Sequence, residues 1–150
     1  WQSRYYKELF QSDNNDERCK QISLNYLEGL EWTFKYYTDT CPDWRWKYNY
    51  NYPPLLNDLI KYVPYFDTDL IDNQFKNPVN NLVQLSYVLP RNSLSLLPAN
   101  IYTYLVKNHS DWYKLDYCII WAYCRYLWEG HVEMDEIDIN KLTEIISLQK

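Results

Sequence analysis

Glycine is scarce in this sequence, whose 150 residues contain only Gly29 and Gly130. A Gly-rich phosphate-binding loop needs several glycines close together, because the backbone must approach the phosphate without side chains in between. The sequence therefore excludes such a loop. Histidine is equally scarce, with only His109 and His131. Neither lies in a context typical of a nucleophile–histidine–acid triad, so a hydrolase of that type is disfavoured.

Positive charge and long apolar runs are also limited. The formal net charge is −5, so charge alone does not hold this segment to nucleic acid, although contact within a larger assembly stays possible. The longest apolar run, residues 117–124, is too short to span a membrane, and we expect no membrane contact. Met134 is the single methionine and the sequence starts at Trp1, which leads us to expect a segment of a longer protein or a product of cleavage.

Cysteine is present but not in a pattern that indicates disulfides or a metal site. The four cysteines include no CxxC pair, and a chain of this size can fold without disulfides. We interpret all four as free thiols in a reducing compartment.

Aromatic residues are abundant. They make up 19% of the chain, with 17 Tyr and 7 Trp, so much aromatic surface must lie in a core, an interface or a stacking site. One stretch, residues 41–58, reads CPDWRWKYNYNYPPLLND and has neither a helical period nor a clean alternation. We expect a long, irregular, aromatic-rich loop there.

Hydrophobic spacing predicts a mainly helical chain around this loop. The longest expected helix covers residues 18–37, with one face formed by Ile22, Tyr26, Leu30, Phe34 and Tyr37, and with a favourable Glu31–Lys35 pair. Proline and polar residues predict a loop over residues 64–78. Further helices are expected over residues 55–62, 80–89 and 98–107, a single turn over 93–97, and a final helix that Asp138 caps.

Residues 112–128 are ambiguous, because their apolar run fits either a buried helix or a buried strand. A zinc site built from Cys118, Cys124 and His131 has unfavourable spacing, and burial of both cysteines in the core is the favoured interpretation. The acidic run after Trp128 could hold Mg²⁺ or Mn²⁺, but a solvated surface or a helix entry is more typical of such a run. Its members are Glu129, His131, Glu133, Asp135, Glu136 and Asp138.

The strongest candidate for function is the loop itself, where cations alternate with tryptophans. Trp44 and Trp46 could stack on the bases of single-stranded nucleic acid, and Arg45 and Lys47 could contact phosphates. The alternative is a loop buried against a partner domain, with the aromatic side chains supplying apolar area. Spacing alone favours that alternative.

Several motifs, taken together and in order, favour nucleic-acid binding over burial against a partner domain. The chain resembles the second conserved region of the Xrn-type 5′→3′ exoribonucleases, which shows Y-x-x-G-x-x-W-x-x-x-Y-Y, then SWxWYYPYHYAPxxSD, QLLAVLP, ELLP and WEAVVLIPFIDxxxL. Here the helix motif matches at Tyr26, Gly29, Trp32, Tyr36 and Tyr37, and the loop motif matches at Trp44, Trp46, Tyr48, Tyr50, Tyr52, Pro54 and Asp58. The later motifs match at residues 84–90 and 95–98, and at Trp128, Glu129, Ile137, Asp138 and Leu142.

Some positions depart from the family pattern. In the loop, Asp43, Lys47, Asn49, Asn51 and Pro53 replace the family's serine, tyrosine, proline, histidine and alanine. Residues 130–136 replace an apolar stretch. These departures lead us to expect a divergent member of the family, from a large DNA virus or a protist.

The resemblance implies that residues 1–150 are a helical domain fragment, the C-terminal part of a larger nuclease module. It implies that the Mg²⁺ ligands and the 5′-monophosphate pocket belong to an N-terminal nuclease region outside this chain. This segment would wall the active site and admit single-stranded RNA, with Trp44 or Trp46 stacked on bases and Arg45 and Lys47 on the RNA backbone. Tyr48, Tyr50, Tyr52 and Asp58 would structure the loop.

Two other functions stay open beside this one. The chain could be a non-catalytic protein- or RNA-interaction module derived from such an enzyme, or, more distantly, a metal enzyme built around His131. For an enzyme that degrades RNA we expect a cytoplasmic location, with the nucleus as the alternative.

Overall fold

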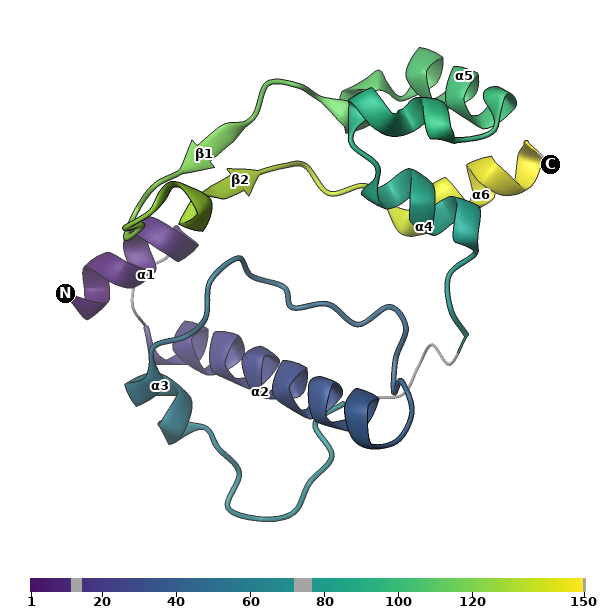
Figure 1. Ribbon diagram of the computed structural model, residues 1–150. Coiled ribbons are helices and arrows are strands. Elements are labelled where there is room, and N and C mark those ends of the chain that lie inside the picture. Colours follow the sequence, from purple (N-terminus) through teal and green to yellow (C-terminus); the bar gives the residue numbers. More distant parts are fainter. Residues whose placement is uncertain (12–14, 72–76, 150) are drawn as a thin grey trace. The chain divides into compact units, whose positions relative to one another are not determined.

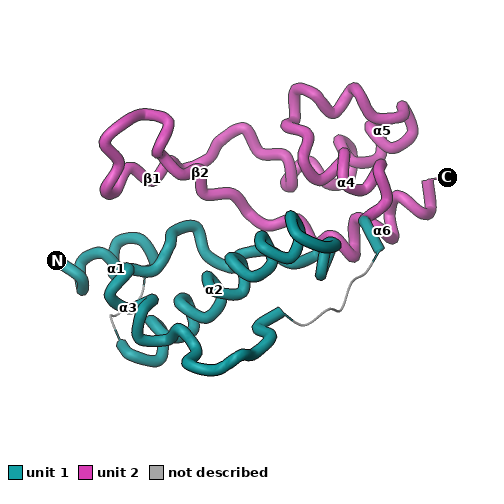
Figure 2. The backbone as a smooth tube through the Cα atoms, turned by 60° about the horizontal axis from the view of Figure 1, so that its bottom comes forward, with its two compact units in different colours: residues 1–78 teal, residues 79–150 magenta. Residues whose placement is uncertain are grey.

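The computed structural model describes residues 1–11, 15–71 and 77–149 and is mainly helical, as the sequence predicts. Figures 1 and 2 show that the chain divides into two compact units, residues 1–78 and residues 79–150. Each unit has its own cluster of buried apolar side chains. The expectation that residues 1–150 form a single domain stays a prediction.

In its described residues, the first unit contains the helices α1 (Gln2–Phe10), α2 (Asp16–Thr38) and α3 (Leu56–Lys61). The Asn15 side chain caps α2 by accepting a hydrogen bond from the backbone N–H of Arg18 at 2.7 Å. Lys35 and Glu31 form the expected ion pair, with Nζ and Oε1 2.6 Å apart. The helices predicted over residues 18–37 and 55–62 are thus confirmed, whereas α1 was not predicted.

Tyr6 of α1 lies at the centre of the first core and packs with Cys19 and Ile22 of α2. Half-buried Tyr5, Phe10, Tyr50, Leu55 and Tyr62 surround these residues. Burial raises the pKa of the Cys19 thiol. The core therefore joins α1, α2 and the segment that leads into α3.

The interior face of α2 differs from the predicted one. Ile22 is fully buried, but Leu30, Phe34 and Tyr37 are 51%, 68% and 81% exposed. The face of α2 that contacts residues 41–58 instead runs through Asn25, Gly29 and Trp32, which are spaced four and three residues apart. Hydrophobicity alone did not indicate this face, because a polar residue and a glycine lie on it.

The second unit contains α4 (Asn81–Val88), α5 (Ala99–Asn108) and α6 (Ile139–Leu148), with the 3₁₀ turns η1 (Arg91–Leu96), η2 (Ser110–Tyr113) and η3 (Leu127–Glu129). The predicted helices are confirmed, except that Pro98 is the N-cap of α5 and not its first residue. The Asp138 carboxylate caps α6 as expected, accepting hydrogen bonds from Asn140 N–H at 2.8 Å and Lys141 N–H at 3.3 Å. The core consists of Val83, Leu94, Leu97, Ile101, Leu105, Tyr113, Ile137, Leu142, Ile145 and Ile146.

A two-stranded antiparallel hairpin extends from this core. Strands β1 (Cys118–Ile120) and β2 (His131–Glu133) pair with Ile119 opposite Val132. Residues 112–128 therefore form a turn, a short strand and a hairpin end, and the prediction of a buried element is wrong. Cys118 is exposed and Cys124 is half-buried, so neither lies in the core, and all four cysteines are free thiols.

Residues 64–71 and 77–78 contain no helix or strand, in agreement with the predicted loop, whose remaining residues lie outside the described ones. No helix in the described part of the chain is long and apolar enough to cross a membrane.

Candidate functional site

The aromatic loop, residues 41–58, leaves the end of α2 and runs back along that helix to α3 (Figure 1). It contains no regular element before Leu56. Its backbone groups and side chains therefore need other partners, and α1 and α2 provide many of them.

The start of the loop is fixed to α2 by Trp32. The indole N–H of Trp32 donates a hydrogen bond to the backbone carbonyl of Asp43 at 2.7 Å. The Asp43 side chain is buried and accepts a hydrogen bond from the backbone N–H of Arg45 at 2.6 Å. This local turn, which an aspartate or asparagine typically forms, places Trp44 at its apex.

Trp46 packs directly on α2. Its ring stacks on that of Trp32, with centroids 6.1 Å apart, and Trp32 stacks in turn on Tyr36 at 5.1 Å. A Cβ atom added to Gly29 would lie 2.6 Å from Cη2 of Trp46, which is closer than real contacts allow. Gly29 is therefore needed because it lets the indole approach the helix backbone.

The four sequence-predicted contact residues have different surroundings. Trp44 is 44% exposed, whereas Trp46 is half-buried in the stack just described. Lys47 is exposed and Arg45 is half-buried. Of the two tryptophans that the sequence could not separate, Trp44 presents the larger open surface and Trp46 serves the packing of the loop.

The tyrosines of the loop pack against residues of α1 and α2. Tyr48 packs edge-on against Tyr26 of α2, and its hydroxyl donates a hydrogen bond to the Tyr52 carbonyl at 2.7 Å. Burial raises the pKa of the Tyr48 hydroxyl. The Tyr50 and Tyr52 rings both pack against Phe10 of α1.

A polar contact fixes the middle of the loop. The Asn25 side-chain oxygen accepts a hydrogen bond from the Asn49 backbone N–H at 2.9 Å, and its amide nitrogen donates to Glu28 at 2.8 Å. Asn25 is 8% exposed, so the partners satisfy a polar group that is costly to bury alone. No pattern in the sequence predicts a role for Asn25.

Asp58 holds the end of the loop. Its buried carboxylate accepts hydrogen bonds from the Tyr6 hydroxyl and from Lys61 Nζ, each at 2.8 Å. The Tyr6 oxygen also accepts a hydrogen bond from the Leu55 N–H at 3.3 Å, and burial raises the pKa of this phenol. The carboxylate raises the pKa of Lys61, its ion-pair partner.

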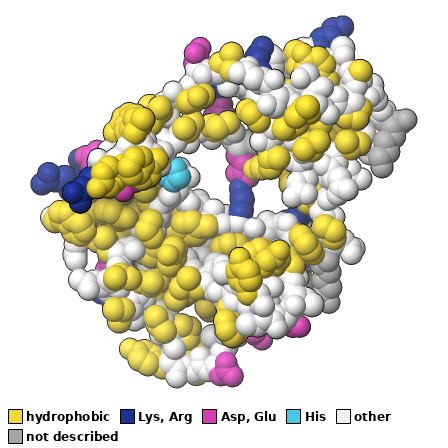
Figure 3. Space-filling model, viewed as in Figure 1, with side chains coloured by type: hydrophobic (Ala, Val, Ile, Leu, Met, Phe, Trp, Pro, Cys, Tyr) yellow, Lys and Arg dark blue, Asp and Glu magenta, His cyan; other side chains and the backbone are white. Residues whose placement is uncertain are grey.

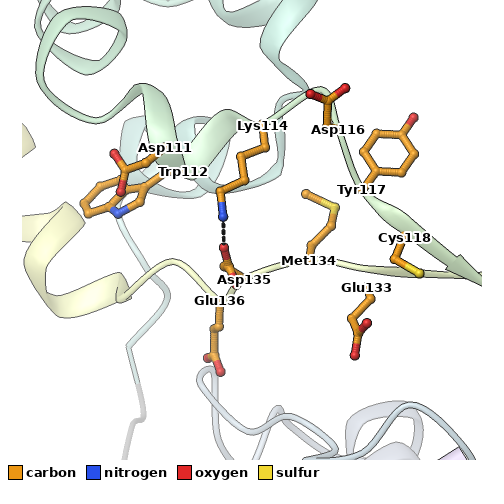
Figure 4. A pocket seen from close by; sticks show the side chains of 10 residues that line it. All are labelled: Asp111, Trp112, Lys114, Asp116, Tyr117, Cys118, Glu133, Met134, Asp135 and Glu136. Carbon is orange, nitrogen blue, oxygen red and sulfur yellow. Dashed lines mark hydrogen bonds and ion pairs between the residues drawn. The ribbon is translucent and has the colours of Figure 1, made fainter.

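A cavity with a volume of about 540 Å³ lies in the second unit. Carboxylates from the acidic run line it, and Lys114 forms an ion pair with Asp135 inside it (Figure 4). The carboxyl groups of Asp116, Glu133 and Glu136 lie apart from one another in this view. Within the described residues, no three His, Cys, Asp or Glu side chains are close enough together to hold a metal ion.

Apolar side chains also cover much of the exposed surface. Figure 3 shows hydrophobic groups across one face, with charged groups scattered between them. Tyr65, Phe66 and Trp128 are 97%, 75% and 79% exposed. Such exposed apolar area is typical of surfaces that contact other molecules or other parts of the same protein.

The family model and the relatives that match this chain all belong to the same group of proteins. The protein-family model described as "Xrn1 helical domain" matches residues 1–149. The chain is 30% identical to 5′-3′ exoribonuclease 2 of Schizosaccharomyces pombe over 98% of its own length, and 30% identical to that of Gallus gallus over 95%. It is also 33% identical to 5′-3′ exoribonuclease 1 of Saccharomyces cerevisiae over 65% of its length. The chain spans 15% of the first two relatives and 6% of the third.

Proposed function

Because this chain belongs to the Xrn1 helical domain family, we propose that the protein that carries it is a 5′→3′ exoribonuclease acting on 5′-monophosphorylated, single-stranded RNA. In this proposal the chain walls the active site and does not itself cleave. The support is the set of relatives, which are named 5′-3′ exoribonucleases. We propose the cytoplasm as the location, with the nucleus as the alternative.

The proposal assigns cleavage to an N-terminal nuclease region outside this chain, where Mg²⁺ would be held. Divalent metals support phosphodiester hydrolysis by activating water and stabilising developing charge. Among residues 1–11, 15–71 and 77–149 no three His, Cys, Asp or Glu side chains are grouped closely enough to hold a metal. In this proposal the chain's own contribution is to bind and orient the RNA strand.

Trp44 is the residue proposed to stack on an RNA base. The observation that carries this is the contrast between its open indole and that of Trp46, which packs on Gly29 and Trp32. Hydrogen bonds to Asp43 on one side and the packing of Trp46 on the other hold the backbone at Trp44 on α2. Arg45 and Lys47 follow Trp44 in the loop and are proposed to contact the phosphates.

The test is decay of 5′-monophosphorylated RNA by the full protein with Trp44→Ala. Loss of one stacked base costs about 1–3 kcal/mol, so kcat/KM should fall by about fivefold or more. Trp44→Phe should retain most of the activity, because it keeps a flat ring. Tyr65→Ala is the matched control, since Tyr65 is an exposed aromatic residue of the same unit outside the loop.

Unchanged decay in Trp44→Ala, with a normal fold, would refute the stacking role. If the wild-type protein binds a partner but does not degrade RNA, the chain is instead part of a non-catalytic interaction module.

A further inference from the structure

Two cavities of the second unit adjoin and form one groove. The cavity of about 540 Å³ shares Trp112, Lys114, Tyr117 and Met134 with a neighbouring cavity of about 390 Å³. All residues that line the two cavities lie between positions 87 and 137, so the groove belongs to the second unit alone. Each volume falls in the range of about 300–1,000 Å³ that is typical of ligand sites. We name the two cavities together the second-unit groove.

The smaller cavity gives the groove an apolar end that is open to solvent. Its walls include Val88, Leu115 and Met134, which are 63%, 60% and 65% exposed. Met134 also lines the larger cavity, and its flexible thioether can adapt to ligand side chains of different shape. This end of the groove therefore suits an aliphatic or aromatic side chain.

The larger cavity gives the groove an acidic end. Carboxylates line it at five positions, which are Asp111, Asp116, Glu133, Asp135 and Glu136. A single cation, Lys114, lies among them and forms an ion pair with Asp135 (Figure 4), so its charge is compensated. The excess of negative charge attracts cationic groups and repels phosphates. The groove is therefore unsuited to a strand of RNA.

The spread of the carboxylates indicates which kind of cation fits. The carboxyl groups of Asp116, Glu133 and Glu136 lie apart from one another (Figure 4), and the described part of the chain has no group of three His, Cys, Asp or Glu for a metal ion. Cations spaced along a ligand can meet separate carboxylates one by one. A peptide with Lys or Arg on both sides of an apolar side chain has such spaced cations, and its apolar side chain matches the other end of the groove.

We propose that the second-unit groove binds a basic segment of a partner protein, in which an apolar side chain is flanked by Lys or Arg. The apolar side chain packs among Val88, Leu115 and Met134, and the flanking cations pair with Asp116 and Glu133. Lys114 competes with these cations for Asp135. The inference goes beyond the proposed function and does not depend on it, because no RNA contact enters it.

The test is equilibrium binding of a fluorescent synthetic peptide to the full protein, measured by fluorescence anisotropy. The probe is Lys-Lys-Ser-Leu-Phe-Ser-Lys-Lys. It should bind saturably and more weakly as salt is added, because the ion pairs form at an exposed surface. A peptide with Glu in place of the four lysines, and one with Ser-Ser in place of Leu-Phe, should each bind about tenfold more weakly or worse.

Charge substitutions in the groove should change the peptide affinity in opposite directions. Asp116→Asn and Glu133→Gln each remove a carboxylate and should weaken binding by about twofold to fivefold. Lys114→Gln removes the competing cation and should strengthen binding by about twofold. Glu144→Gln is the matched control, because Glu144 is an exposed carboxylate of the same unit outside the groove and its loss should leave the affinity unchanged.

An apolar substitution supplies an independent readout. Met134→Ser removes the side chain that both cavities share and should weaken peptide binding by about fivefold or more. Leu148→Ser is the matched control, since Leu148 is 82% exposed and lies outside the groove. Both side chains are exposed, so both variants should unfold at nearly the same temperature as the wild type.

Three outcomes overturn the inference. The first is binding of the lysine peptide that is no tighter than that of the glutamate peptide. The second is equal weakening in Glu133→Gln and Glu144→Gln, which would show that the peptide responds only to net charge. The third is tighter binding of single-stranded RNA in Glu133→Gln together with weaker binding of that RNA in Lys114→Gln, with divalent metal chelated, which would assign the groove to RNA.

Discussion

At the scale of single residues, the contact between Gly29 and Trp46 decides how the aromatic loop lies on α2. Glycine inside a helix normally costs about 1 kcal/mol relative to alanine. Gly29→Ala should nevertheless destabilise the chain, because the new Cβ would lie 2.6 Å from the Trp46 ring. Thermal unfolding of the variant should show a lower midpoint than that of the wild type.

A second pair of variants removes the Trp46 ring with which the new Cβ would clash. In a Trp46→Leu background, Gly29→Ala should no longer destabilise and should recover the usual gain from helix propensity. A destabilisation of the same size in both backgrounds would contradict the assignment of Gly29 to this contact.

The sequence predicts Trp44 and Trp46 as candidate RNA contacts but cannot assign a different role to each of them. Trp44 and Trp46 have the same residue type and sit two positions apart, so nothing local distinguishes them. They differ through Gly29 and Trp32, which come from another element. Asp58 was predicted as an anchor from the family motif, but its partner Tyr6 lies 52 positions away and no spacing rule indicates it.

At the scale of elements, the packing of α6 shows how much depends on one helix face. Leu142 is fully buried in the second core, whereas Leu148 of the same helix is 82% exposed. Leu142→Ala should lower the free energy of unfolding by about 2–5 kcal/mol, since it leaves a cavity. Leu148→Ala should change that free energy by less than about 0.5 kcal/mol. Denaturant unfolding of both variants checks this, and equal effects would contradict the assigned face.

Helices were predictable because their signals are local. Asn15 and Asp138 cap α2 and α6 through contacts with residues two or three positions away. The hairpin was not predictable in the same way. Its turn lacks the usual Asn-Gly or Asp-Gly pair, and Tyr123 instead adopts a left-handed conformation with φ of 62°.

At the scale of the whole molecule, buried tyrosines contribute to the response of stability to alkaline pH. Burial raises the pKa of Tyr113 to about 12, and also raises those of Tyr6 and Tyr48. A folded pKa above the unfolded value of about 10 means that the neutral phenol is favoured in the folded chain. The resulting stabilisation is complete below pH of about 10. It is lost as the pH rises towards the folded value of about 12 for Tyr113.

Tyr113→Phe tests this response. It removes one of these groups, so the free energy of unfolding should fall less steeply between neutral and strongly alkaline pH than in the wild type. The variant should also lose about 1 kcal/mol at neutral pH, because the Tyr113 hydroxyl donates a 2.9 Å hydrogen bond to the Ser86 carbonyl. Tyr65→Phe is the control, since Tyr65 is 97% exposed. An identical pH dependence in wild type and Tyr113→Phe would contradict the prediction.

The spacing of the loop contacts on α2 has a consequence for how this region can change over evolution. Asn25, Gly29 and Trp32 meet the loop from one side of the helix. Inserting a single residue between Asn25 and Gly29 would rotate everything after it by about 100°. The number of residues between these three positions therefore cannot drift without releasing the loop.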